Sequence, residues 1–211
     1  ILLAVLEEVE LGNLDLDQAV VTVNPKEAIA TDITVQYALI KMISESSNYY
    51  SGVSQRLLAA DGNNGKTKTA QTSIKYGFGK GIFWVGKGYA NGSSYPGVSY
   101  NHEGTTSAIT NFYLQLAQDK LPMSKVMREI MTNSKISNRF YGELKKTIPT
   151  DSLFRKSGSL TSLHSYSDSI MVEYNNLNFI LVMLIQGQSC MTTSTYQTWH
   201  SKLAKMILDY T

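Results

Sequence analysis

Two apolar runs near the end of the chain, separated by a pair of asparagines, constrain the fold most strongly. Residues 166–174 and 177–186 are rich in aliphatic and aromatic side chains, and Asn175-Asn176 lies between them. Asparagine tolerates the positive φ that a two-residue hairpin turn requires. The pattern therefore predicts an antiparallel pair of strands in the last third of the chain.

A helix is expected after this hairpin, starting at Ser194 as its N-cap. Apolar side chains then recur at helical spacing, which predicts that they form the inner face of the helix. These residues are Trp199, Leu203, Met206 and Ile207.

The first 150 residues carry mainly helical periodicity. Apolar side chains recur three and four residues apart in residues 1–11, 33–44 and 49–60, and Thr31 or Asp32 is the expected cap of the second helix. Two further helices are expected after Thr105-Thr106-Ser107 and after Ser124. The first half of residues 1–11 is apolar on nearly all sides, which is typical of a central, buried helix.

A glycine-rich stretch interrupts the helical region. Residues 61–104 hold ten of the fifteen glycines and show no helical period, so we expect a long irregular or hairpin-rich excursion. Such excursions often form functional rims or lids. We interpret residues 1–211 as one domain, helical over about residues 1–150, with a sheet and terminal helix over about residues 151–211. The expected fold is of α/β (α+β) type, with helices packed on an antiparallel sheet.

Composition excludes several functional classes. The 211 residues include 19 basic and 17 acidic side chains, a balance that argues against a nucleic-acid partner. No apolar run reaches the roughly 20 residues of a membrane-spanning helix. Cys190 is the only cysteine and the three histidines are widely spaced, so we expect neither a metal site nor a cofactor. Residues 60–67 approach a phosphate-binding loop but lack its first glycine and follow a helix, which argues against nucleotide binding.

Lys156-Ser157-Gly158 directly precedes the predicted strand pair. On a strand edge these residues would offer an ammonium, a hydroxyl and a backbone that a ligand can approach closely, because glycine has no Cβ. This set suits a carboxylate-bearing substrate with an electrophilic carbonyl. Taken alone, the same tripeptide also occurs in surface turns.

A second polar motif, Ser46-Ser47-Asn48, lies at the junction of two predicted helices. In this order, the two motifs resemble the Ser-Asp-Asn and Lys-Thr-Gly elements of class A β-lactamases and penicillin-binding proteins. Thr105-Thr106-Ser107 is similar to the start of the helix that follows the Ω-loop of that family. The resemblance runs from end to end and implies a β-lactamase/transpeptidase-like fold.

The resemblance also implies a role for each motif residue. Ser46 would relay a proton between the nucleophile and the leaving group, and Asn48 would hold the substrate amide. Lys156 would set the local potential and orient Ser46. Ser157 would bind the substrate carboxylate.

Two neighbours complete the implied substrate site. The backbone N–H of Ser159 would supply half of an oxyanion hole. Gly158 would let the substrate lie close to the strand.

The chain also departs from the family pattern. Ile1-Leu2-Leu3 resembles the central helix just after the lysine of the Ser-x-x-Lys motif, so we expect the nucleophilic serine in an N-terminal part that is missing from this chain. Position 47 is a serine where many relatives carry an aspartate. The Glu-x-x-Leu-Asn motif that supplies the deacylating glutamate is not found in residues 61–104, and Glu103 is the only glutamate there.

These features predict a penicillin-recognising serine hydrolase that acts on β-lactams or D-alanyl-D-alanine peptides through an acyl-enzyme, with slow deacylation. Glu103 is the tentative candidate for the deacylating base. The alternative is a non-catalytic relative that binds cell-wall peptide or a protein partner. The resemblance further implies an extracytoplasmic location, on the cell surface, in the periplasm or in the medium.

Overall fold

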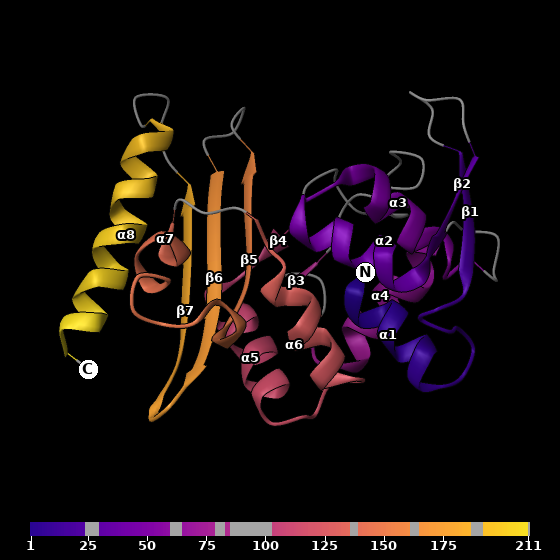
Figure 1. The fold of residues 1–211 in the computed structure, drawn as a ribbon, viewed down its shortest axis with the longest axis horizontal. Coiled ribbons are helices and arrows are strands. Elements are labelled where there is room, and N and C mark those ends of the chain that lie inside the picture. Colours follow the sequence, from indigo (N-terminus) through magenta and orange to yellow (C-terminus); the bar gives the residue numbers. More distant parts are fainter. Residues whose placement is uncertain are drawn as a thin grey trace.

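A computed structural model describes residues 1–23, 30–59, 65–78, 83–84, 103–135, 139–160, 165–186 and 192–210. Helices and strands occur in the order expected for helices packed on an antiparallel sheet, which confirms the predicted fold class (Figure 1). The elements are α1 (Leu2–Glu10), β1 (Ala19–Val23), β2 (Ala30–Thr34), α2 (Val35–Ser44), α3 (Asn48–Arg56), α4 (Lys66–Lys75), β3 (Phe83–Trp84), β4 (Glu103–Gly104), α5 (Thr106–Ala117), α6 (Ser124–Thr132), α7 (Phe140–Leu144), the 3-10 turn η1 (Thr150–Ser152), β5 (Leu153–Leu160), β6 (Ser165–Tyr174), β7 (Leu177–Gln186) and α8 (Thr193–Tyr210).

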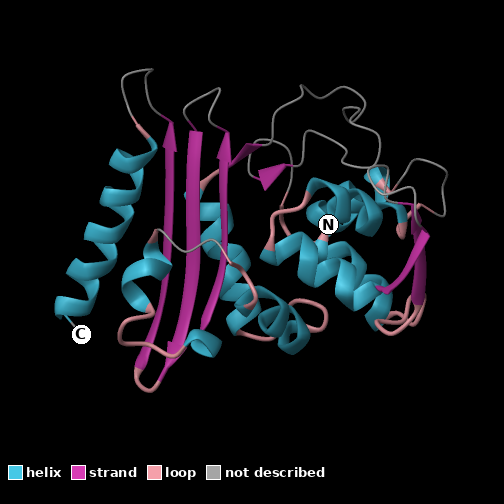
Figure 2. Ribbon diagram, turned by 45° about the horizontal axis from the view of Figure 1, so that its top comes forward, coloured by secondary structure: helices cyan, strands magenta, loops and turns pink. Residues whose placement is uncertain are grey.

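Strands β5, β6 and β7 form a three-stranded antiparallel sheet in that order. The predicted hairpin is present, because Tyr174 pairs with Leu177 and Asn175 adopts a φ of 52°. Asn175 and Asn176 therefore form a two-residue turn between β6 and β7. Figure 2 shows the three strands side by side, with α8 at one end of the molecule and the helical cluster at the other.

Helices cover both faces of the sheet. Neighbouring residues of a strand point to opposite faces, so they pack into different cores. On one face Leu153, Ile170 and Leu181 pack against α7 and α8. On the other face Phe154 and Met171 join the core of the helical cluster. Burial on two sides explains the uninterrupted apolar run Ile170-Met171-Val172 within β6.

Helix α1 lies in the middle of the helical cluster, as its sequence predicts. Val5 and Leu6 are fully buried and pack with side chains of α2, α5 and α6, among them Leu39 and Leu116. Among the described residues, none of the helices combines the length and the apolar character that a membrane crossing demands.

Residues 66–75 contradict the expectation of irregular structure throughout 61–104, because they form α4. The sequence hides this helix, since its inner face is polar. Thr69 and Thr72 are buried, and Thr72 donates a hydrogen bond of 2.6 Å to the buried carboxylate of Glu7 on α1. A helix that buries hydroxyls on a charged partner has no apolar stripe by which periodicity could detect it.

The predicted starts of several helices were wrong by one to three residues. Thr31 and Asp32 pair with β1, so the cap of α2 is Thr34, whose hydroxyl accepts a hydrogen bond from Tyr37 N. Ser124 is the first residue of α6, after Met123 in a left-handed conformation. Thr192, which accepts from Thr195 N at 3.3 Å, precedes α8 in place of Ser194.

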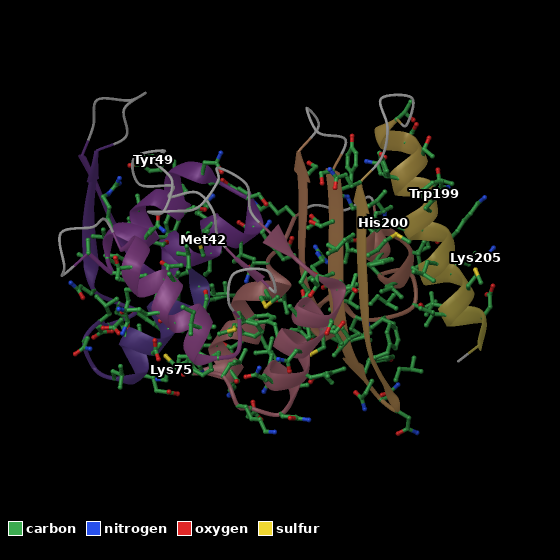
Figure 3. The ribbon with its side chains drawn as sticks, turned by 180° about the vertical axis from the view of Figure 1, so that it is seen from behind. Met42, Tyr49, Lys75, Trp199, His200 and Lys205 are labelled. Atoms are coloured by element: carbon green, nitrogen blue, oxygen red, sulfur yellow. The ribbon has the colours of Figure 1, made fainter. Side chains whose placement is uncertain are left out.

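The inner face of α8 was also predicted in part wrongly. Tyr196, His200 and Ala204 are fully buried, whereas Trp199 and Met206 are 42% and 56% exposed. Residues four apart share one helix face, so Tyr196, His200 and Ala204 form the inner face of α8. The polar ring of His200 is accommodated there because its Nδ1 lies 2.6 Å from Tyr196 O and the ring packs on Phe140. Figure 3 shows His200 on the sheet side of α8 and Lys205 on its outer side.

Candidate functional site

The two predicted motifs meet where β5 passes the junction of α2 and α3. The Lys156 ammonium donates hydrogen bonds to Ser46 Oγ and, at 2.7 Å, to Ser157 O. Ser46 lies 110 residues before Lys156 and adopts a φ of 49°, in the left-handed region. The fold therefore joins a helix junction and a strand that are far apart in sequence.

A cavity of about 290 Å³ lies beside this contact. Helices supply apolar walls that include Ile43, Ile109 and Phe112, and the start of α1 contributes Leu3. The strands supply a polar wall that consists of Lys156, Ser157, Gly158, Ser167, Asp168 and Ser169. An apolar cavity with a few convergent polar groups is the usual form of a small-molecule site.

Ser157 offers an unused hydroxyl on this wall. Its side chain is buried and its Oγ finds no hydrogen-bond partner among the described residues. A buried hydroxyl without a partner costs about 1–3 kcal/mol, so a ligand that supplies an acceptor recovers this cost.

Arg139 braces the strand that carries the second motif. Its Nη1 donates to Gly158 O at 2.9 Å and also to Ser167 O. A Cβ on Gly158 would lie 2.9 Å from Ser167 Oγ, so the Ser167 hydroxyl would have to rotate away to admit a larger residue. Ser159 follows in β5, with an exposed side chain and its backbone opposite Tyr166.

The charges around the cavity are mainly positive. Asp168 lies opposite Ser157 in the sheet and accepts a hydrogen bond of 2.9 Å from Phe140 N. Burial raises the pKa of its carboxyl to about 6. Arg139 and Arg155, both mostly buried, lie near this one carboxylate. Together with Lys156 they leave an excess of positive charge, which favours an anionic ligand.

The pKa of Lys156 is itself perturbed. Burial, followed by the positive charge of Arg139, lowers it to about 8, while Asp168 acts in the opposite direction. A lysine that titrates near neutral pH and contacts a serine hydroxyl is a functional-site candidate on physical grounds.

A buried tyrosine ties the strands to helix α5. Tyr113 Oη lies 3.1 Å from Ser169 Oγ, and Ser169 Oγ donates to Lys156 O at 2.9 Å. Burial raises the pKa of Tyr113, which keeps its hydroxyl protonated. This chain of contacts fixes the backbone of β5 at Lys156, within the lining of the cavity.

Two predicted site residues are not joined to this cluster. Asn48 is the first residue of α3 with an exposed side chain, and no hydrogen bond from it is found among the described residues. The backbone of Glu103 pairs with Trp84 in the β3–β4 ladder, and its side chain lies outside the described part of the chain. Ser47 serves the local fold, because its hydroxyl caps α3 by accepting from Tyr50 N.

The sequence analysis assigned no role to Arg139, Arg155 and Asp168. An acidic residue within an apolar strand was a signal for Asp168, since a buried carboxylate needs partners. Arg139 belongs to no motif, and only the fold reveals its contact with Gly158. Within the described residues, no three His, Cys, Asp or Glu side chains gather in a way that could hold a metal ion.

Comparison with known proteins gives a consistent result. The sequence profile described as the beta-lactamase enzyme family matches residues 1–211. The structure is similar to a beta-lactamase from Chitinophaga pinensis, with a TM-score of 0.74, 17% identity and coverage of 99% of this chain and 81% of that one. A beta lactamase from Burkholderia vietnamiensis gives a TM-score of 0.74, 17% identity and coverage of 99% and 80%.

An ancestral class A beta-lactamase is also similar, with a TM-score of 0.73 and 17% identity. The match covers 100% of this chain and 82% of the ancestral protein. Among curated proteins, none matches the chain significantly.

Proposed function

The chain belongs to the beta-lactamase enzyme family, and on that premise we propose that it is a penicillin-recognising serine hydrolase of the class A β-lactamase-like group. Its substrates are β-lactams or D-alanyl-D-alanine peptides, and the reaction passes through an acyl-enzyme. The protein works outside the cytoplasm, where these substrates occur.

One observation carries the proposal: the contact of Lys156 with Ser46 at the edge of an apolar cavity. Two motifs that resemble catalytic elements are in contact there. If Lys156-Ser157-Gly158 were an ordinary surface turn, its contact with Ser46 would have no explanation. The unpaired hydroxyl of Ser157 on the same wall supports the assignment.

In the proposed reaction, a serine N-terminal to Ile1 is the nucleophile, because the cavity lies at that end of α1 and is lined by its first residues. The serine oxygen attacks the substrate carbonyl, and the backbone N–H of Ser159 stabilises the oxyanion that forms. The proton lost by the attacking serine hydroxyl passes to Ser46, which Lys156 orients. Ser46 in turn gives its own proton to the leaving nitrogen as the C–N bond of the substrate breaks. Asn48 holds the substrate amide.

The same wall positions the substrate. Ser157 donates its hydroxyl hydrogen to the substrate carboxylate, and the positive potential of Lys156 and Arg139 favours that charge. Gly158 leaves room for the substrate to lie along β5.

Release of the acyl group is proposed to be slow. No glutamate occurs among the described residues that line the cavity, and the Asp168 carboxylate in this lining already accepts from Phe140 N and lies near Arg139 and Arg155, so the glutamate that activates water in class A enzymes has no counterpart in this lining. Glu103 is the candidate base within residues 61–104 only if hydrolysis proves to be fast.

Covalent labelling tests the proposal. Protein that includes the residues N-terminal to Ile1 should gain the mass of one penicillin on a serine of that segment, as intact-mass spectrometry followed by peptide mapping would show. Ser46→Ala should slow labelling by about 10²–10⁴-fold, the usual cost of a lost proton relay. Ser54→Ala, in α3 but outside the cavity lining, is the matched control.

A folded protein that gains no mass at saturating penicillin would overturn the enzymatic proposal. If such a protein still binds penicillin or a cell-wall peptide reversibly, by calorimetry, the chain is a non-catalytic binder. This second function is the alternative that the resemblance leaves open.

A further inference from the structure

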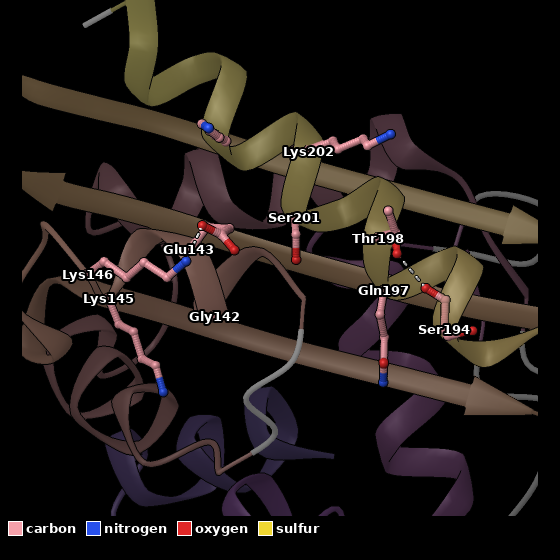
Figure 4. A pocket seen from close by; sticks show the side chains of 10 residues that line it. Gly142, Glu143, Lys145, Lys146, Ser194, Gln197, Thr198, Ser201 and Lys202 are labelled. Carbon is pink, nitrogen blue, oxygen red and sulfur yellow. Dashed lines mark hydrogen bonds and ion pairs between the residues drawn. The ribbon is translucent and has the colours of Figure 1, made fainter.

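A second hollow lies between α7 and α8, on the outer side of the molecule, and the proposed hydrolase does not use it. It is a shallow, open hollow of about 750 Å³. Side chains from the two helices and the residues after α7 line it: Gly142, Glu143, Lys145, Lys146, Ser194, Gln197, Thr198, Ser201, Lys202 and Lys205. We refer to these ten residues as the α7–α8 groove. Figure 4 shows Gln197 and Ser201 pointing from α8 toward the α7 side.

The α7–α8 groove concentrates positive charge. It carries four lysines and one glutamate, an excess of three positive charges, whereas the whole chain has a net charge of +2. The groove therefore carries a larger excess of positive charge than the chain as a whole. Each wall contributes two lysines: Lys145 and Lys146 on the α7 side, and Lys202 and Lys205 on α8.

Three of the four lysines are available to a ligand. Lys146 forms an ion pair of 2.6 Å with Glu143, so its charge is already compensated. Among the described residues, Lys145, Lys202 and Lys205 have no carboxylate partner. The Lys145 ammonium lies over the Tyr141 ring, 5.1 Å from its centroid.

The lining also excludes two kinds of anionic partner. It contains no aromatic or aliphatic side chain, so it offers neither a stacking surface for nucleic-acid bases nor an apolar group that could enter a bilayer. Hydroxyl and amide groups between ammonium groups suit a flexible, hydrated chain of phosphates.

We propose that the α7–α8 groove binds a linear phosphodiester polymer without bases, and that Lys145, Lys202 and Lys205 neutralise its phosphates. This binding is separate from the proposed hydrolysis, because the groove shares no residue with the cavity beside Lys156.

Binding of poly(glycerol phosphate) to the complete protein tests this proposal, by fluorescence anisotropy at several salt concentrations. Release of counterions from a single-stranded polyanion gives a slope of log K against log salt of about −0.7 for each phosphate contacted, so three lysines predict about −2. The double variant Lys202→Gln/Lys205→Gln should reduce the slope to about −0.7 and the affinity about tenfold. Lys120→Gln/Lys125→Gln removes the same charge from the exposed surface of the helical cluster and should change neither value.

A gain of binding gives a sharper test. Glu143→Gln releases Lys146 from its ion pair, so the slope should steepen to about −3 and the affinity should rise about threefold. The proposal is overturned if the two double variants lose affinity equally. It is also overturned if phosphatidylglycerol vesicles or single-stranded DNA bind more tightly than the polymer at equal phosphate through the same lysines. Labelling by penicillin should be the same in all these variants, which separates this proposal from the proposed hydrolase.

Discussion

Lys156 keeps its positive charge only below about pH 8, because burial and the Arg139 guanidinium lower the pKa of its ammonium to about that value. In the proposed reaction this ammonium orients Ser46 and faces the substrate carboxylate. We therefore expect the acylation rate to fall as the pH rises through about 8. Lys156→Arg keeps its charge to higher pH, so the fall should disappear in that variant. Stopped-flow acylation rates across this pH range would check the prediction, and an identical pH profile in both proteins would contradict it.

Removal of the Lys156 side chain should affect acylation far more than folding. Lys156→Ala loses a preorganised electrostatic contact, which costs about 2–4 kcal/mol of transition-state stabilisation, or roughly 30- to 1,000-fold in rate. Its folding stability should not fall, because the folded state holds the ammonium at a lowered pKa. Between about pH 8 and the ordinary lysine value the folded protein binds fewer protons than the unfolded one, so a rise in pH over that range favours folding.

The variant can be compared with Lys120→Ala, an exposed lysine of the helical cluster. Acylation rates and thermal unfolding of the two proteins separate the two effects. A well-folded Lys156→Ala protein with an unchanged acylation rate would show that Lys156-Ser157-Gly158 is an ordinary structural segment.

Helix α4 is held to α1 by polar contacts. Glu7 is only 3% exposed, and its carboxylate accepts from Thr72 Oγ1 at 2.6 Å and from Lys75 Nζ at 2.5 Å. Burial acts to raise the pKa of Glu7, but the hydrogen bonds from Lys75 and Thr72, together with the positive charges of Lys75 and Lys68, outweigh it and hold the pKa below its ordinary value. Because α4 and the residues after it supply Ser73 and Phe78 to the cavity, this contact also shapes the candidate site.

Glu7→Gln should therefore destabilise the protein by about 1–3 kcal/mol at neutral pH, the cost of weakening hydrogen bonds to a buried charge. The stabilising effect of a carboxylate with a lowered pKa is present above its unfolded value and disappears as the pH falls, so wild type and variant should converge in acid. Urea unfolding at two pH values measures this difference. Glu129→Gln, at an exposed position of α6, provides the control, and equal losses in both variants would contradict the role of Glu7.

The elements that the sequence predicted are those with a clear apolar pattern. Helix α1 and the β6–β7 hairpin could be predicted because both are buried among apolar neighbours. Helix α4 could not, since its inner face binds a charge, and the cap of α2 was displaced because β2 extends to Thr34. The spacing of apolar residues detects helices that bury an apolar face. It does not detect a helix such as α4, which is held by hydrogen bonds and ion pairs to a buried carboxylate.

The candidate site shows the same division. Ser46 and Lys156 were paired in advance because two short motifs resemble those of a family, and the structure brings them together. Arg139 and Asp168 add the remaining charges. Arg139 is placed by its hydrogen bond to Gly158 O, and Asp168 by its position opposite Ser157 in the sheet. Neither relation leaves a trace in local sequence, so these two residues required the fold.

At the scale of the whole molecule, the candidate site lies between the two halves of the fold. Strand β5 belongs to the sheet and contacts the helical cluster through Phe154, while Ser46 belongs to the helices. The Lys156–Ser46 contact therefore depends on how sheet and helices pack, and a variant that loosens this packing should lose both stability and acylation.

The last prediction concerns turnover by the complete protein. An acyl-enzyme is released by an activated water, and the loss of a positioned general base slows such a step by about 10²–10⁴-fold. Because no glutamate lines the described cavity, β-lactam hydrolysis should show a rapid burst of acylation followed by slow turnover, and Glu103→Gln should leave both phases unchanged. Stopped-flow kinetics with a chromogenic β-lactam would measure the two phases. Fast steady-state hydrolysis without a burst, abolished in Glu103→Gln, would instead identify Glu103 as the base and place residues 61–104 over the cavity.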